Sequence, residues 1–169
     1  MPSTRPDASV ARLAGQLDEI TRLVRFQPDV LALRADSVSQ WSVGLQLDHI
    51  LRVLEFGQQV LGAVKTPLPR GMNLTGRIVL ALGWFPRGVA KSPKRVLPAE
   101  QSPADLAERA AHLRRVYCET PLSAAVFADK RPVFPHPVFG GLTAEQGLHF
   151  LGIHTHHHLK IVADIRRRS

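Results

Sequence analysis

The stretch from Thr143 to Arg166 constrains the fold most, because its apolar residues recur with the period of an α-helix. At about 100° per residue, one helix face is an apolar stripe that also carries two histidines. The stripe consists of Phe150, Leu151, His154, His158, Ile161, Val162 and Ile165. A stripe of this width is expected to face a hydrophobic core. The chain must therefore supply other helices that cover it.

Helical periodicity also dominates the first half of the chain. Apolar residues spaced three and four apart predict a helix over roughly 7–26. A second helix is expected to begin after Ser39 or Ser42, either of which is a good N-cap, and to end near Pro67. The short apolar segment 74–82 is a candidate extra helix.

Two clear start signals mark the helices of the second half. Ser102 followed by Pro103 predicts one helix start, and Thr143 with Gln146 forms a capping box before the last helix. No segment alternates as a strand would, and the residues around 86–98 and 121–141 are expected to form long loops. We predict an all-α fold, an antiparallel four-helix bundle with long loops, in a single domain over residues 1–169.

The two histidines of the apolar stripe indicate a metal site. Side chains four residues apart lie above one another on a helix face, so His154 and His158 can bind the same divalent ion. Burying two unpaired imidazoles is costly, and a shared metal removes that cost. The competing interpretation is a pair of core histidines satisfied by hydrogen bonds. His154 with His157 is an alternative pair, whereas His149 and His156 are expected to face water.

A third ligand is expected from the second helix. His49 shares its helix side with apolar residues, away from the polar stripe of Asp48, Arg52, Glu55 and Gln59, which is expected to lie on the outer face. An inward histidine on a second buried helix can meet the pair on the last helix. His112 is expected at the surface, and the position of His136, between two prolines, is left open. We predict a divalent metal site formed by His49, His154 and His158, near which Trp41, Trp84 and Arg87 are candidates to line a pocket.

Composition and charge narrow the range of partners. The formal net charge is +8, but the basic residues are spread along the chain and clustered only at 166–168, where they complement a helix C-terminus. We therefore expect no nucleic-acid partner. The longest apolar run, 78–85, is too short to span a bilayer, so no membrane partner is expected. The N-terminus lacks a signal-peptide pattern and Cys118 is the only cysteine, which favours a cytoplasmic location.

Taken together, these residues resemble the DinB/YfiT-like superfamily of metal-dependent four-helix bundles. The resemblance covers roughly residues 35–165 and includes a tryptophan-led second helix with an inward histidine and a His-x-x-x-His last helix. His136 to Gly140 match a His-Pro-Val-Phe-Gly stretch of one uncharacterised branch. By this resemblance, His49, His154 and His158 correspond to the metal ligands of the family.

The resemblance also implies an activity. Family members with known activity are thiol S-transferases or hydrolases that use low-molecular-weight thiols, many bind nickel or zinc, and many form homodimers. The implied function is a metal-dependent transferase or hydrolase that acts on a small-molecule substrate. Many members read Arg-Gly-Gln after the last ligand, where this chain reads Leu159-Lys160-Ile161. The alternative is a bundle that binds a metal or ligand without catalysis.

Overall fold

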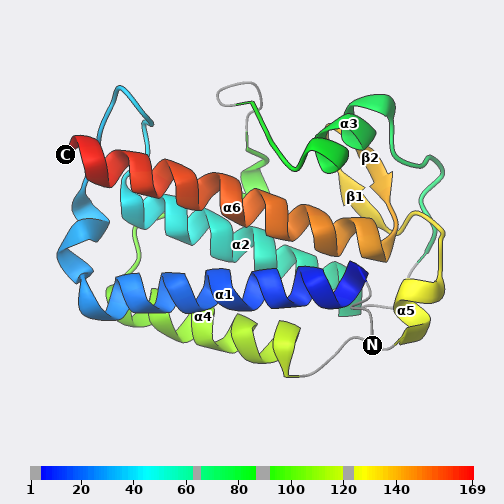
Figure 1. Ribbon diagram of the computed structural model, residues 1–169, viewed down its shortest axis with the longest axis horizontal. Helices are drawn as coiled ribbons and strands as arrows, with labels where there is room; N and C mark the ends of the chain where they lie inside the picture. The colour runs from blue at the N-terminus through cyan, green and yellow to red at the C-terminus, as the bar shows by residue number, and fades with distance from the viewer. Residues whose placement is uncertain (1–4, 63–65, 87–91, 120–123) are drawn as a thin grey trace.

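The computed structural model describes residues 5–62, 66–86, 92–119 and 124–169. Four long helices dominate the described residues: α1 (Arg5–Phe26), α2 (Val43–Gly62), α4 (Pro103–Cys118) and α6 (Ala144–Arg168). Shorter elements connect them: η1 (Pro28–Ala32), α3 (Leu74–Leu82), η2 (Lys94–Val96) and α5 (Ala124–Ala128). The predicted all-α bundle is confirmed (Figure 1).

The helices begin where their capping residues predict. At the start of α2 the backbone N–H of Leu45 donates to Ser42 Oγ at 3.2 Å, which identifies Ser42 rather than Ser39 as the cap. Ser102 caps α4, and the capping box of Thr143 is complete at the start of α6. Each cap satisfies backbone donors that the first helical turn leaves without intrahelical partners.

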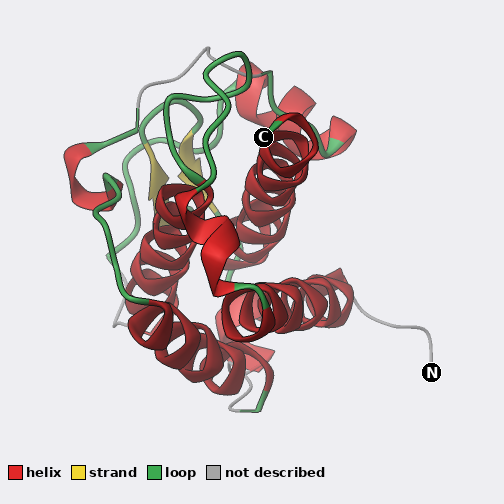
Figure 2. Ribbon diagram, turned by 90° about the vertical axis from the view of Figure 1, so that its left-hand side faces the viewer, coloured by secondary structure: helices red, strands yellow, loops and turns green. Residues whose placement is uncertain are grey.

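The four long helices surround one hydrophobic core, and Figure 2 shows the helices from the end of the bundle. Helix α1 packs on α4 and α6, and α2 packs on the same two helices. In Figure 1, α1 and α6 run in one direction and α2 and α4 in the other. Neighbours α1·α4 and α2·α6 are therefore antiparallel, whereas α1·α6 and α2·α4 are parallel. Of these two parallel pairs, only α2 and α4 are consecutive long helices, so the chain between them must return along the bundle, which accounts for the long segment between Gly62 and Pro103.

A short hairpin lies in the segment that the sequence predicted as loop. Strands β1 (Phe134–His136) and β2 (Gly140–Leu142) pair antiparallel, with Phe134 opposite Leu142. Three residues per strand are too few to produce a recognisable alternation. Gly140 adopts a φ of 83°, and a Cβ at Gly141 would lie 2.4 Å from the carbonyl oxygen of Arg70. The glycines therefore allow the hairpin to turn and to pack closely against the chain before α3.

Helix α3 is confirmed as an extra helix beside α6. The Asn73 side chain accepts from the Gly76 N–H at its start, and Gly83, with a φ of 64°, ends it in the left-handed conformation. Gly76 faces inward, where an added Cβ would lie 2.8 Å from Phe139 Cβ. Together with the hairpin, α3 covers part of α6 (Figure 1). No helix in the described ranges is long and apolar enough to cross a membrane.

Candidate metal centre

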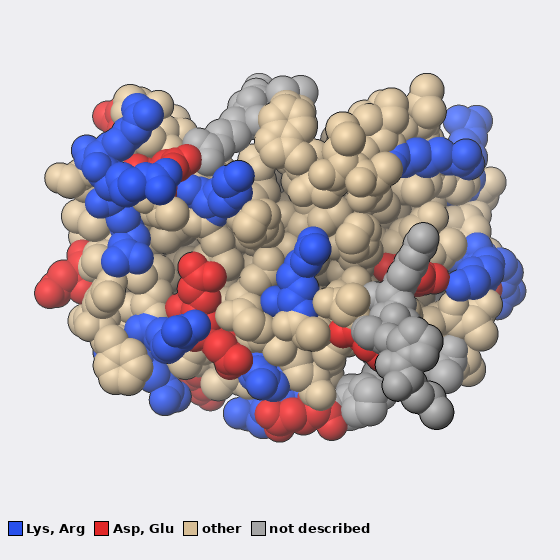
Figure 3. Space-filling model, in the orientation of Figure 1, with Lys and Arg blue, Asp and Glu red and all other residues tan. Residues whose placement is uncertain are grey.

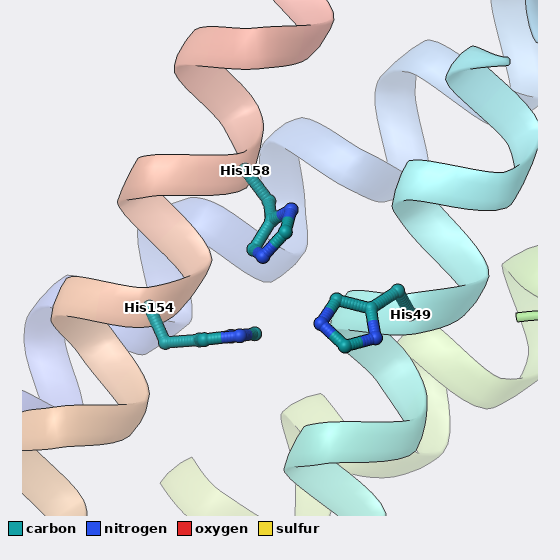
Figure 4. A group of neighbouring side chains, drawn as sticks. All are labelled: His49, His154 and His158. Carbon is teal, nitrogen blue, oxygen red and sulfur yellow. The ribbon is translucent and has the colours of Figure 1, made fainter. Parts of the chain in front are cut away.

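Three histidines converge between α2 and α6, as Figure 4 shows. His49 projects from α2, and His154 and His158 project from successive turns of α6. Their ring centroids lie 5.1 Å (His49–His154), 4.6 Å (His49–His158) and 4.5 Å (His154–His158) apart. One ring nitrogen of each lies within 4.8 Å of those of the other two. The structure thus brings together the three residues that the sequence singled out.

The ring of His49 is oriented by the segment before α4. Its Nδ1 lies 2.7 Å from the carbonyl oxygen of Val96 in η2. A carbonyl only accepts, so Nδ1 carries the proton and donates, and the lone pair is on Nε2. The imidazole is 3% exposed, and the indole of Trp41 packs on it with ring centroids 5.0 Å apart. The ring of His49 is therefore fixed both in tautomer and in orientation.

A glutamine one turn before His49 orients His158 in the same way. His158 Nδ1 lies 2.7 Å from Gln46 Oε1, and Gln46 Nε2 donates to Ser39 Oγ at 2.8 Å. Because the amide nitrogen of Gln46 donates to Ser39, its amide oxygen is the atom that faces His158 and accepts the proton of His158 Nδ1. This leaves Nε2 of His158 as the lone-pair donor. Metal-binding histidines commonly donate their second ring nitrogen to such an acceptor.

His154 differs from the other two histidines in one respect. Its Nδ1 is buried and has no hydrogen-bond partner among the described residues. A buried polar atom without a partner costs free energy. The donor set of two oriented imidazoles and one with an unpartnered nitrogen fits a single divalent ion, which imidazole ligands suit well.

The surroundings keep the three imidazoles neutral. Burial lowers the pKa of His49 and lowers the pKa values of His154 and His158 well below the ordinary value. Burial is the main cause because it disfavours the charged imidazolium, and the proximity of the other histidines adds to it for His154 and His158. Neutral imidazoles have the free lone pair that metal coordination requires.

A buried ion cluster holds the segment that contacts His49. Asp48 is fully buried and pairs with Arg109 of α4 at 2.5 Å and with Arg52 at 2.6 Å. Its Oδ2 also accepts from the N–H of Ala99 at 2.8 Å. Burial opposes ionisation, but hydrogen bonds to Arg109, Arg52 and Ala99 lower the pKa of Asp48 below its usual value. Asp48 and its neighbour His49 thus both bind the segment 96–99, from opposite ends.

The burial of Asp48 corrects the prediction that its polar stripe lies on the outer face of the helix. Arg109 reaches across from α4 and also forms a bidentate pair with Glu55, at 2.7 and 3.0 Å. Asp48 and Glu55 lie seven residues apart on one face of α2, which is about two helical turns. Two carboxylates at this spacing were a signal for a shared basic partner, but the periodicity of α2 alone could not show that the partner is Arg109. Sequence reasoning also missed Gln46, whose role depends on a contact 112 residues away.

Aromatic rings enclose the cluster on the side of the hairpin. Phe150 and Phe85 pack against the His154 ring at 5.5 and 6.3 Å between centroids. His136, whose position was left open, stacks on Phe139 at 4.0 Å and meets Phe150 edge-on at 4.7 Å. Its Nδ1 accepts from the backbone N–H groups of Val138 and Phe139. His136 therefore supports the aromatic wall, and burial lowers its pKa to about 4.

The remaining histidines lie where the helical register predicted, with one exception. His112 and His156 are exposed, and the His157 ring packs on Phe85 beside the cluster, outside the convergent group. His149, expected to face water, is half-buried, and its Nε2 lies 3.3 Å from the carbonyl oxygen of Leu80. Helix α3 covers it, which the pattern of α6 alone could not indicate. Trp41 lines the site, Trp84 is exposed, and Arg87 lies outside the described residues.

The fold and the site together define a helical bundle with a three-histidine cluster able to hold a divalent ion. The family model of the DinB superfamily matches residues 7–162. The chain therefore belongs to the DinB superfamily, as the sequence motifs indicated. Neither the curated proteins nor the solved structures offer a match to it.

Proposed function

We propose that this protein binds one divalent metal ion through His49, His154 and His158 and uses it in thiol S-transfer or hydrolysis. The observation that carries the proposal is the convergence of three neutral imidazoles, two of which are oriented by hydrogen bonds to Val96 and Gln46. Zinc and nickel are the ions that we expect, because many members of the superfamily bind one of them and imidazole ligands suit both.

The chemistry follows from a donor set of three imidazoles. Such a set leaves coordination positions open, and a bound divalent ion lowers the pKa of a water or thiol that enters one of them. The protein contributes orientation through Val96 and Gln46, and Trp41, Phe85 and Phe150 limit access of water. The carboxylate of Asp48 is already occupied by Arg109, Arg52 and Ala99, so it is not a candidate general base. Family membership supports a small-molecule substrate with a low-molecular-weight thiol as co-substrate.

A second candidate function is binding without catalysis. After the last histidine, Leu159 and Ile161 are 6% and 7% exposed and pack into the core, while Lys160 is exposed. Where many family members have polar residues, this chain thus uses two of three positions for packing. That observation favours a bundle that retains the metal or a ligand but lacks polar groups for substrate chemistry.

Metal content is the direct test of the site. Elemental analysis of the purified, untagged protein should give about one divalent ion per chain, as expected for one three-histidine site. His154→Ala and His158→Ala should lose it, because each removes a ligand. His156→Ala is the matched control, since its ring is exposed on the same helix, and it should retain the ion. Equal metal content in all three variants would refute the assignment of the ligands.

Activity separates the two candidate functions. We expect the metal-loaded protein to conjugate a thiol to an electrophile, or to hydrolyse an activated ester or amide, and His49→Ala to lose this activity while circular dichroism shows the helices intact. A screen of thiols and electrophiles without metal-dependent turnover, together with a small molecule that co-purifies, would support the binding function instead. Homodimer formation and a cytoplasmic location remain predictions, which sedimentation and cell fractionation test.

A further inference from the structure

The outer face of α3 is an apolar surface without cover in the described structure. Three leucine and isoleucine side chains at a spacing of four residues are open to solvent there. Two further exposed apolar residues adjoin the helix, a tryptophan just after its C-cap and a valine in the hairpin turn, whose backbone contacts the helix start. Their exposed fractions are 71% for Leu74, 50% for Ile78, 68% for Leu82, 57% for Trp84 and 46% for Val138. We call these five residues the α3 patch.

The exposure of the α3 patch does not result from poor packing of α3. The inner side of α3 is already satisfied, because Gly76 and Leu80 are buried against the rest of the protein. Val138 is held next to the helix start, since Asn73 Nδ2 donates to its carbonyl oxygen at 2.7 Å. A surface helix normally has charged or polar residues on its outer face. Helix α3 instead has apolar residues on both sides, which is expected when its outer face also has a partner.

The charged residues near the patch indicate what kind of partner would bind it. Residues 56–99 contain seven Lys or Arg residues and no Asp or Glu. Within this acid-free segment, Arg77 lies on α3 itself and Arg70 shortly before it, and both are exposed. Figure 3 shows the uncharged surface over α3 with basic side chains at its edge. The partner should therefore combine an apolar interior with negative charge.

We propose that the α3 patch docks the protein onto the surface of a membrane that contains anionic lipids. Leu74, Ile78 and Leu82 would enter the boundary of the acyl chains, with Arg70 and Arg77 at the phosphate headgroups. Apolar residues on one face combined with basic residues at its edge are typical of helices that lie in the membrane interface. Trp84, at the end of α3, is of the residue type that prefers this interface.

Two other partners fit the patch less well. A second copy of the chain in a twofold interface would place the same surface against itself, and Arg70 and Arg77 would then face like charges without acidic partners. Nucleic acid would pair with the basic residues, but its affinity comes from phosphate contacts, which the five apolar residues cannot supply. The proposed docking is peripheral and needs no membrane-spanning helix, and none of the described helices is long and apolar enough to be one.

The test is co-sedimentation of the full-length protein with lipid vesicles. The protein should bind vesicles of phosphatidylcholine with about one third phosphatidylserine, and binding should weaken with salt, because the basic residues interact with the anionic headgroups. Vesicles of phosphatidylcholine alone should bind markedly less. On binding, Trp84 fluorescence should shift to shorter wavelength. Ile78→Glu combined with Leu82→Glu should abolish binding, since each places a carboxylate in the docked face.

The controls keep the interpretation unambiguous. Phe26→Glu is the matched variant, because Phe26 is 78% exposed but lies on α1 outside the patch, and it should bind as the unmodified protein does. Arg77→Gln leaves the apolar residues intact and should weaken binding about five-fold, as expected for one basic residue near an anionic surface.

Three results would overturn the proposal. They are the absence of binding to anionic vesicles, equal binding by the Ile78→Glu/Leu82→Glu and Phe26→Glu variants, and a dimer in sedimentation that only the patch variant disrupts. Stronger binding to duplex DNA than to vesicles, lost with Arg77→Gln alone, would identify nucleic acid as the partner instead. Because none of these measurements depends on metal content, a negative result leaves the proposed metal site untouched.

Discussion

Replacement of Gln46 by leucine tests whether hydrogen bonding to His158 matters for metal binding. Gln46 is 1% exposed, its Oε1 accepts from His158 Nδ1 at 2.7 Å, and its Nε2 donates to Ser39 Oγ at 2.8 Å. Leucine has a similar volume but neither polar group. The Gln46→Leu variant therefore removes the acceptor that fixes the His158 tautomer, while the three proposed ligands stay in place.

The expected magnitude follows from the contacts that are lost. Removal of a hydrogen-bond partner behind a ligating histidine typically lowers metal affinity about 10- to 100-fold, which corresponds to about 1.4–2.7 kcal/mol. Without metal, the loss of an acceptor for His158 Nδ1 should also lower the free energy of unfolding by about 1–3 kcal/mol. Gln46→Glu keeps an acceptor at this position, so we expect it to retain most of the affinity.

Metal affinity is measured by competition with a chromophoric chelator, and unfolding by urea titration of the metal-free protein. The matched control is Gln16→Leu, since Gln16 is also a buried glutamine, 7% exposed, and donates to the Gly152 carbonyl oxygen of α6. It should lose stability but keep metal affinity. If both variants lose the same affinity, the loss reflects general loosening of α6, and the role assigned to Gln46 is incorrect.

Two further predictions concern the stability of the metal-free protein. Asp48→Asn should lower the free energy of unfolding by about 2–3 kcal/mol, which is less than the full cost of breaking a buried pair because Arg109 remains paired with Glu55. The control is Asp18→Asn, which breaks an exposed pair and should cost under about 1 kcal/mol. Equal losses for the two variants in urea titrations would contradict the buried cluster. Burial lowers the pKa of His136 to about 4 in the folded protein, compared with about 6.5 in the unfolded chain. The stability that its neutral imidazole contributes is therefore complete above pH 6.5 and is lost as the pH falls toward 4. Between pH 6.5 and 4 the free energy of unfolding of the His136→Gln variant should therefore fall less with decreasing pH than that of the unmodified protein, by about 2 kcal/mol after a discount for partial exposure. If both proteins show the same dependence of unfolding free energy on pH, His136 is not buried as a neutral imidazole.

The helices and the histidine pair could be predicted because both depend on local geometry. The 3.6-residue period places His154 and His158 on one face whatever surrounds them, and the caps at Ser102 and Thr143 act within one turn of their own helix. His49 was also identified from its own helix, since its neighbours on that side are apolar. The family match then agrees with the motif over most of the chain.

Predictions failed where a residue's surroundings come from elsewhere in the chain. The polar stripe that contains Asp48 has the pattern of a solvent-exposed face, but Arg109, 61 residues later in the chain, pairs with Asp48 in the folded structure. His149 faces outward on α6 by register, yet α3 packs over it. The strands of the hairpin at 134–142 are too short to alternate, and they depend on the close approach of Gly141 to Arg70.

The amino-acid sequence alone was sufficient for the all-α class, the helix starts and the inward orientation of the three histidines, because periodicity and capping operate over a few residues. Tertiary structure decided which helices run parallel, which carbonyl and amide oxygens orient His49 and His158, and which face of α3 remains open. These features depend on contacts between residues tens to more than a hundred positions apart. Side-chain patterns describe the face that a helix presents, but only packing determines what that face meets.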